Sequence, residues 1–386
     1  MHHADQVSYI ERMLHMARAN TRDDGQISHT SVEDYFDPAR FEREKAILFR
    51  KYPVVVGFSA QLRKPGDFIA NNDTGQAILV ARGLDGKLRA FLNVCRHRSA
   101  TVELKSCGAN KRAFVCPYHG WSYDLTGKLV GITDGAWFGE VDRAALGLKQ
   151  LAVAEHCGMV FVVPTALEPG QSGEIDIGSY FGAVKDDLAG WDMTGWEVQS
   201  TTPLRPRMNW KLVIDTFLEL YHFRYLHGAS VAPLFLDNIT AYERRAQHSR
   251  FAVCKPSLLE VESAPRESWR LRDHAVVLYN LFPNTVLAYT ADHCGVFTSY
   301  PISPDEALIN VSVLVDPVER AKKPESYWKT NQDLILAALD EDFTVGASAQ
   351  ANFRSGANKV QTFGKFEKAL GWYHQEINDA LAAAAE

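Results

Sequence analysis

The sequence predicts an α+β protein with two domains, one all-β and the other built from a central antiparallel sheet covered by helices. Its 386 residues exceed what one hydrophobic core usually serves. Short apolar runs separated by turns fill residues 53–164, whereas the rest of the chain mixes strand-like runs with long helical patterns. We therefore place the all-β domain at 50–164 and the second domain at 1–49 together with 165–386.

Each element follows from a local pattern. Apolar residues at helical spacing predict helices at 6–20 and 38–51. The turns LDGKL at 84–88 and LTGKL at 125–129 each place a glycine between two apolar runs, which is typical of hairpins. A loop rich in Gly, Glu and Ser follows Pro164 and marks the domain boundary. Beyond it, helices are predicted at 210–227, 325–353 and 364–384, and antiparallel strands at 274–303 and 306–317.

Composition and charge exclude several classes of protein. Apolar and charged fractions of 46% and 23% are ordinary for a globular chain. A net charge of -6 gives no electrostatic reason to expect nucleic acid. No apolar run approaches the roughly 18 residues that a membrane helix needs, and the first residues lack the apolar segment of a signal peptide. We therefore expect a cytoplasmic protein with no membrane or nucleic-acid partner.

Two short stretches, NVCRHRSA at 93–100 and FVCPYHGWSYD at 114–124, each carry one cysteine and one histidine. Zinc accepts such ligands, but structural zinc sites usually pair like residues at each knuckle. A thioredoxin-like thiol pair would need Cys-x-x-Cys, which is absent from the sequence. Mixed pairs suit a two-iron cluster in which two thiolates hold one iron and two imidazoles hold the other. Zinc remains the less favoured alternative.

The spacing Cys-x-His, eighteen residues, Cys-x2-His, followed by Gly-Trp-Ser-Tyr-Asp, resembles a Rieske [2Fe–2S] centre. The resemblance implies that the cluster is held by Cys95, His97, Cys116 and His119. Respiratory Rieske proteins carry two further cysteines, at the positions taken here by alanine and tyrosine. No disulfide can therefore brace these loops, which indicates the oxygenase or ferredoxin branch. Ser99 stands where the oxygenase family usually has glycine.

A second constellation lies at 209–228, in NWKLVIDTFLELYHFRYLHG. His222 and His227 are five residues apart, which on a regular helix places them roughly 140° apart. They can share a metal only if the helix ends or loosens after His222, and Gly228 is consistent with the chain leaving the helix. Glu219 lies three residues before His222, so those two side chains share a helix face.

Non-haem Fe(II) oxygenases hold their iron with two histidines and one carboxylate, and leave other positions open. The stretch at 339–356 supplies three candidate acids, Asp340, Glu341 and Asp342. An acid run on a helix is also typical of a solvated face. Residues alone leave the choice among the three acids open.

The tripeptide Asn-Trp-Lys at 209–211, followed by acid-x-Tyr-His-x4-His at 219–227, resembles the mononuclear iron motif of the Rieske non-haem iron oxygenases. The match is to the catalytic alpha subunits of the ring-hydroxylating oxygenase family. In that family the acid ligand is followed by a glutamine in the next turns, which selects Asp342 because Gln350 follows it. The resemblance thus implies an iron held by His222, His227 and Asp342.

The same resemblance implies the fold and the assembly. The expected second domain is a helix-grip-like catalytic domain, and the expected oligomer is a homotrimer arranged head to tail. In the family, an acid bridges a cluster histidine of one subunit and an iron histidine of its neighbour. By motif position that catalytic bridge is Glu219 here. We expect the substrate pocket to be formed by strand residues around 279–300 together with Leu218, Phe223, Leu226 and Phe235.

The implied activity is that of a terminal oxygenase. Electrons from NAD(P)H would arrive through a separate reductase, with or without a ferredoxin, and O2 would be used to hydroxylate a small organic substrate. An aromatic substrate, in aromatic hydrocarbon catabolism, is the first expectation. The alternative is an N- or O-demethylating monooxygenase that acts on a methylated amine or a methyl ether. A more distant alternative is an electron-transfer protein without an active mononuclear iron.

Overall fold

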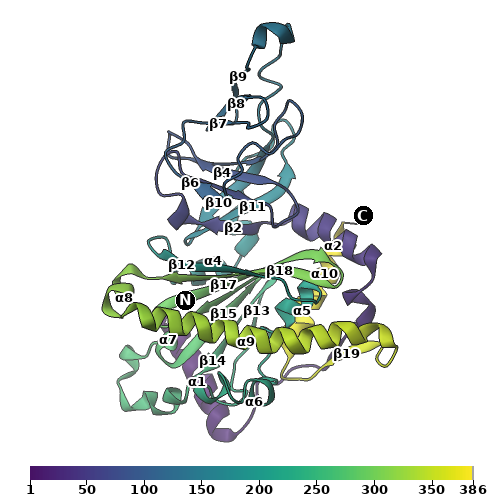
Figure 1. Ribbon diagram of the computed structural model, residues 1–386. Coiled ribbons are helices and arrows are strands. Elements are labelled where there is room, and N and C mark those ends of the chain that lie inside the picture. The colour runs from purple at the N-terminus through teal and green to yellow at the C-terminus, as the bar shows by residue number, and fades with distance from the viewer. Residues whose placement is uncertain (385–386) are drawn as a thin grey trace. The chain divides into compact units, whose positions relative to one another are not determined.

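The computed structural model describes residues 1–384, and its elements are labelled in Figure 1. The chain forms two compact units. The smaller unit comprises Phe49–Tyr180 and Met193–Gly195. The larger unit comprises Met1–Leu48, Phe181–Asp192 and the chain from Trp196 onward. Within the described residues, no helix has both the length and the apolar character that crossing a membrane requires.

The smaller unit is all-β, as the turn-rich sequence predicts. A seven-stranded antiparallel sheet has the strand order β2-β11-β10-β5-β4-β3-β6, and a three-stranded sheet has the order β7-β8-β9. The two predicted hairpin turns join β4 to β5 and β8 to β9. The strands are β2 (Val54–Phe58), β3 (Phe68–Asn71), β4 (Ile78–Arg82), β5 (Leu88–Leu92), β6 (Cys107–Gly108), β7 (Ala113–Val115), β8 (Ser122–Asp124), β9 (Leu129–Gly131), β10 (Gln150–His156) and β11 (Met159–Ala166).

Gly127 shows why the second hairpin turn needs glycine. Its φ of +83° lies in the left-handed region, and an added Cβ would lie 2.5 Å from the ring of Phe91. Phe91 belongs to a buried core that also contains Phe114, Trp121 and Cys116. The turn therefore packs directly on the core that supports the cysteine loops.

The larger unit is built on a second seven-stranded antiparallel sheet, with the order β12-β18-β17-β16-β15-β14-β13. Strands β13 to β18 pair in chain order, and β12 joins the edge beside β18. This is the expected α+β arrangement, and the predicted strands at 274–303 and 306–317 are part of it. The strands are β12 (Glu197–Leu204), β13 (Glu243–Arg245), β14 (His248–Cys254), β15 (Ala275–Leu281), β16 (Thr285–Tyr289), β17 (His293–Ser303) and β18 (Glu306–Val315).

The predicted helices at both ends of the chain are present. They are α1 (His3–Ala19), α2 (Pro38–Lys51), α9 (Glu325–Asn352) and α10 (Lys368–Ala383). Strand β1 (Ser28–Ser31) pairs with β19 (Val360–Phe363) and ties the first part of the chain to the last. Shorter helices complete the chain as α3 (Ile177–Phe181), α4 (Val184–Ala189), α5 (Trp210–Asp215), α6 (Phe223–Leu226), α7 (Leu271–His274) and α8 (Pro317–Lys322).

The prediction of one continuous helix at 210–227 is wrong. Helix α5 ends at Asp215, and α6 begins at Phe223 as a single turn. Between them, the backbone N–H groups of Tyr221 and His222 donate to the carboxylate of Glu219 instead of to helical carbonyls. A side chain that captures backbone donors in this way competes with helix formation. The break places the two histidines on either side of one short turn.

Helix α9 lies across one face of the larger sheet (Figure 1). Its inward side follows a regular stripe, because Asp342, Gly346 and Gln350 are buried at spacings of four residues. A Cβ on Gly346 would lie 2.3 Å from the sulfur of Met208, so the glycine allows a close approach to the chain just before α5. The helix is thereby held near the iron motif.

Buried polar contacts fix α5 from two sides. The indole N–H of Trp210 and the ammonium of Lys211 both donate to Glu44 on α2, at 3.0 and 2.7 Å. The side-chain oxygen of Gln350 accepts the backbone N–H of Asn209 at 3.0 Å, and Asn209 in turn caps α5. The Asn-Trp-Lys motif therefore anchors α5 to α2 and α9 rather than contributing ligands.

Candidate metal centres and substrate cavity

The two cysteine loops of the smaller unit have the same backbone geometry. In each loop the cysteine carbonyl accepts the N–H four residues later, at 2.9 Å for Cys95 and 3.0 Å for Cys116. Each cysteine N–H donates to the carbonyl five residues later, at 2.8 Å in both loops. The fourth residue is Ser99 in one loop and Gly120 in the other, with φ of +59° and +71°. Ser99 thus occupies a position that favours glycine.

These loops bring the four predicted cluster residues together. Cys95 and Cys116 are buried, and the imidazole rings of His97 and His119 lie 4.7 Å apart. The hydroxyl of Tyr123 lies 3.3 Å from the sulfur of Cys95 and accepts the backbone N–H of the next residue. One end of the constellation is therefore thiol-lined and buried, and the other carries two partly exposed imidazoles.

The donor set fits a [2Fe–2S] cluster with unequal irons. The Nδ1 atom of His97 is buried and has no hydrogen-bond partner among the described residues, which leaves it free to ligate. Burial raises the pKa of the Cys116 thiol, and the neighbouring Cys95 raises it further, so a bound cation is needed to hold Cys116 as a thiolate. Partial desolvation, with His97 nearby, lowers the pKa of His119 and favours the neutral ligand form.

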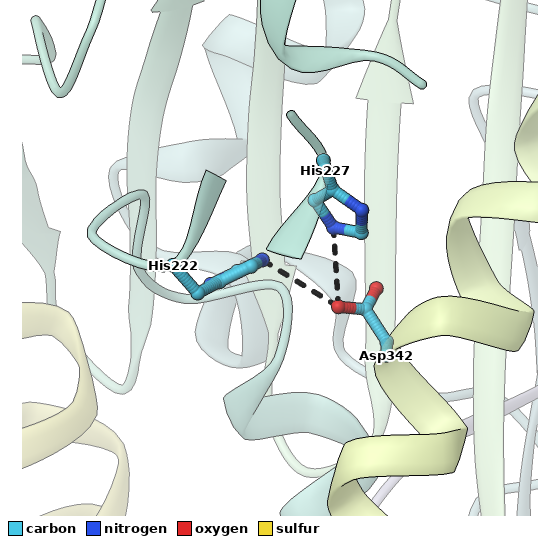
Figure 2. A group of neighbouring side chains, drawn as sticks. All are labelled: His222, His227 and Asp342. Carbon is cyan, nitrogen blue, oxygen red and sulfur yellow. Dashed lines mark ion pairs between the residues drawn. The ribbon is translucent and has the colours of Figure 1, made fainter. Parts of the chain in front are cut away.

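In the larger unit, His222, His227 and Asp342 converge (Figure 2). Asp342 comes from α9, whereas the histidines flank the single turn of α6. Oδ1 of Asp342 lies 3.5 Å from Nε2 of His222 and 3.2 Å from Nε2 of His227. One donor atom of each residue lies within 4.8 Å of the other two, so one ion can contact all three.

Two further carboxylates orient the imidazoles. Nδ1 of His222 is hydrogen-bonded to Glu219, and Nδ1 of His227 lies 2.6 Å from Glu341. Glu341 also accepts the hydroxyl of Ser230 at 2.6 Å. Because each Nδ1 is engaged by a carboxylate, each Nε2 is directed at the shared point beside Asp342. This is the usual way in which proteins set the orientation of a metal-bound histidine.

The structure separates the three candidate acids by role. Asp340 is exposed, Glu341 contacts the outer nitrogen of His227, and Asp342 reaches the point that the two inner nitrogens share. In the sequence, Glu341 is one of the three candidate ligands, and nothing there indicates its orienting role. The only available signal was its position next to Asp342, since nothing local shows that it meets a histidine 114 residues earlier.

The charges of this group favour a cation. Burial alone lowers the pKa of His227, but hydrogen bonds with Asp342 and Glu341 outweigh it and raise the pKa overall. The Nε2 atom of His222 is buried and lacks a hydrogen-bond partner within residues 1–384. Two imidazoles and one buried carboxylate are the donor set of a mononuclear Fe(II) site with open positions.

A cavity of about 480 Å³ adjoins the group and includes His227 and Asp342 in its wall. Alternate residues of the sheet supply one side, and one stripe of α9, from Tyr327 to Asp342, supplies the other. Four phenylalanines also line it, with ring centroids 4.7 Å apart for Phe217 and Phe297 and 6.1 Å apart for Phe223 and Phe235. The space beside the metal ligands is therefore mostly apolar and aromatic.

Some of the predicted pocket residues line the cavity, and two do not. Phe223, Phe235 and residues of 279–300 line the cavity. Leu218 and Leu226 are not in the described wall, and Leu218 is instead fully buried in the core. The prediction is therefore wrong for these two leucines.

Comparison with known protein families gives two matches along the chain. The Rieske [2Fe-2S] domain matches residues 52–136, and the catalytic domain of the ring hydroxylating alpha subunit matches residues 193–383. The first match contains both cysteine loops, and the second contains the histidines, Asp342 and the cavity.

Individual relatives agree with these matches. The glycine betaine monooxygenase oxygenase subunit of Pseudomonas aeruginosa is 28% identical over 395 residues, covering 90% of this chain and 88% of the relative. The quaternary ammonium Rieske monooxygenase CntA, solved with L-carnitine, superposes with a TM-score of 0.77 at 19% identity, covering 92% and 95%. Naphthalene 1,2-dioxygenase from Rhodococcus sp. superposes with a TM-score of 0.76 at 17% identity, covering 98% and 99%.

The family carries two iron cofactors, a Rieske [2Fe–2S] cluster and a mononuclear iron, and the two donor sets described above match them. Its members are enzymes that incorporate oxygen from O2. The chain therefore belongs to the Rieske non-haem iron oxygenases, as an alpha subunit of the ring-hydroxylating type.

Proposed function

We propose that this oxygenase hydroxylates a carbon bonded to the nitrogen of a methylated ammonium compound, and so cleaves the C–N bond. The observation that carries the proposal is the set of four phenylalanine rings in the cavity beside His227 and Asp342. Aromatic faces attract quaternary ammonium groups without requiring a counter-charge. The relative from P. aeruginosa is named for glycine betaine, and CntA is named for quaternary ammonium substrates. Demethylation, the alternative in the sequence analysis, is thus better supported than aromatic hydroxylation.

The proposed reaction balances with one O2 and two electrons. One oxygen atom enters a C–H bond next to nitrogen, and the other leaves as water with two protons. The resulting hydroxyalkyl ammonium loses its hydroxyl proton, the C–N electron pair returns to nitrogen, and an aldehyde departs. For an N-methyl group that aldehyde is formaldehyde. When bound, the metals supply O2 activation and the electrons that it needs.

The chain itself would supply ligands, orientation and a dry cavity. The Nε2 atoms of His222 and His227 and a carboxylate oxygen of Asp342 would hold the iron beside the cavity. Glu341 and Glu219 would keep the imidazoles in place through their Nδ1 atoms. The phenylalanines would orient the methylated nitrogen and exclude water from the reacting carbon.

Electron delivery follows the family pattern in this proposal. A separate reductase, with or without a ferredoxin, would pass electrons from NAD(P)H to the cluster held by Cys95, His97, Cys116 and His119. Glu219 would link an iron histidine to a cluster histidine of a neighbouring copy in a ring of three. Sedimentation of the metallated protein tests the trimer, since a monomer at working concentrations would exclude this route.

A ring hydroxylation remains the second candidate, because the apolar cavity wall would also accept an arene. One single-turnover experiment separates the two. Anaerobically reduced protein is mixed with a pool of methylated ammonium compounds, arenes and aryl methyl ethers, and labelled O2 is admitted. We expect a demethylated amine and one equivalent of trapped formaldehyde. A ring product that carries both labelled atoms would contradict the proposal.

A further inference from the structure

The polarity of the cavity wall changes along α9. Asp342 stands at one end of the stripe, and Tyr327 stands 15 residues earlier, about 22 Å away along the axis at about 1.5 Å per residue. The end near Tyr327 is polar, because Lys323 and Asp292 both contact the Tyr327 hydroxyl. Lys255 also lines the cavity and lies close enough to Asp292 and Lys323 for both charges to act on its pKa, which places it at the same end. The cavity is therefore elongated, with the metal ligands and the lysines at different ends.

Only one of these lysines is neutralised by the protein. Asp292 accepts the ammonium of Lys323, and it also accepts the hydroxyl of Tyr327 at 2.7 Å and lies 2.6 Å from Nδ1 of His293. The hydroxyl of Thr290 also donates to Asp292, at 3.2 Å. Asp292 is thus buried and already in contact with four polar side chains.

Lys255 is left without a counter-ion. It follows β14, is half-buried, and has no ion pair or side-chain hydrogen bond among the described residues. Burial lowers the pKa of its ammonium, and Lys323 adds to this, while Asp292 and Asp273 act in the opposite direction. An unpaired charge in a partly dry cavity is unfavourable, so an anionic ligand group there would be stabilised.

We propose that the end of the cavity at Lys255 is a carboxylate subsite, with Lys323 beside it, and that the substrate is an elongated zwitterion. This rests on the proposed function for the placement of the methylated nitrogen at the metal ligands. A second cation beside Lys255 would be repelled, so the ammonium group takes the phenylalanine-lined end and the carboxylate takes the other. The separation of the ends favours a long spacer over the single carbon of glycine betaine.

The test uses a series of trimethylammonio carboxylates with one to nine methylene groups between nitrogen and carboxylate, and the carboxamide of each. Binding to the metallated protein is measured by calorimetry, and formaldehyde release is measured in parallel. We expect affinity to rise with spacer length, and the carboxamide of the best compound to bind roughly 10- to 100-fold more weakly, as loss of a charge-assisted hydrogen bond implies.

The Lys255→Met variant should bind carboxylate and carboxamide equally weakly, whereas Lys255→Arg should restore the preference for carboxylate. Lys322→Met, at an exposed lysine outside the cavity wall, serves as the control. Equal binding of carboxylate and carboxamide by the unmodified protein would overturn the inference, whatever the variants do. Demethylation that ignores the carboxylate would overturn it while leaving the proposed function intact. Conversely, Lys255-dependent binding of aromatic carboxylates, without demethylation of any ammonium compound, would support the subsite and refute the ammonium substrate.

Discussion

The two metal-binding regions of this chain are organised in opposite ways. The cluster loops in the smaller unit are fixed by their own backbone, since each cysteine carbonyl and N–H closes a turn with residues four and five positions later. The group of His222, His227 and Asp342 is fixed by side chains from distant segments. Local chemistry thus sets the first site, and tertiary packing sets the second.

This difference predicts different sensitivities. A loop fixed by backbone hydrogen bonds responds most to changes in allowed φ, and little to changes in neighbouring side chains. A group assembled by carboxylates should respond to the loss of a single orienting oxygen, because the imidazoles are then free to rotate. Substitutions at the two sites test this difference in sensitivity.

Replacing Asp342 with alanine should have the largest effect. It removes the carboxylate that meets both histidine Nε2 atoms, so we expect loss of the mononuclear iron and of all product formation. The visible spectrum of the cluster should persist, because its ligands are elsewhere. Iron analysis and single turnover measure both. Asp340→Ala is the matched control at an exposed acid two residues away, and equal losses in both variants would refute the choice of Asp342.

Glu341→Gln should have an intermediate effect. The amide still fills the space, but it cannot replace the carboxylate that His227 Nδ1 and the Ser230 hydroxyl share. Loss of such an orienting partner typically lowers metal affinity 10- to 100-fold, about 1.4–2.8 kcal/mol. Titration of the iron-depleted protein with Fe(II) measures it. An affinity equal to that of the unmodified protein would show that His227 needs no carboxylate to hold its orientation.

In the cluster loops, Gly120→Ala and Ser99→Gly should act in opposite directions. A Cβ at Gly120 would lie 2.4 Å from the hydroxyl oxygen of Thr133, at a φ of +71°, so we expect destabilisation by about 1–2 kcal/mol or more. Ser99→Gly relieves a similar backbone penalty of about 1–2 kcal/mol, but the added freedom of the unfolded chain costs about 0.4–1 kcal/mol. The net gain in stability is therefore between about 0 and about 1.6 kcal/mol. Thermal loss of cluster absorbance measures both, and changes of the same sign would contradict the equivalence of the loops.

Tyr123→Phe should have the smallest effect. It removes the hydroxyl 3.3 Å from the sulfur of Cys95, and hydrogen bonds to cluster sulfurs help to set the reduction potential. A net contribution of about 1 kcal/mol corresponds to about 40 mV for one electron, so the potential should fall by about that amount. Protein-film voltammetry gives the value. An unchanged potential would mean that the hydroxyl serves only the backbone N–H of Arg96.

The contrast between the sites also explains what the sequence could predict. The approach of Cys95, His97, Cys116 and His119 could be predicted because each Cys/His pair lies within one short turn. The two histidines were identifiable from their motif, but the helix expected to carry them is broken, because Glu219 captures the N–H groups of Tyr221 and His222. That competition between a side chain and the helix backbone is not visible in apolar periodicity.

Long-range features were harder to predict. The acid at position 342 could be chosen only by resemblance, since Asp340 and Glu341 differ from it in tertiary environment and not in local pattern. The role of Glu341 depends on a contact across 114 residues. Likewise, Lys255 and the α9 stripe meet at one cavity only after the sheet has formed, so neither stretch signals a substrate subsite by itself.

The most direct test of this account is a single turnover of a long-chain trimethylammonio carboxylate by anaerobically reduced protein, in parallel with the Asp342→Ala variant whose cluster is equally reduced. We expect formaldehyde and the dimethylamino product from the unmodified protein alone, with one formaldehyde per product molecule. Equal formaldehyde from both proteins would mean that the group of His222, His227 and Asp342 is not the site of oxidation. Absence of formaldehyde from both, with a ring-hydroxylated product from an arene instead, would contradict the ammonium substrate.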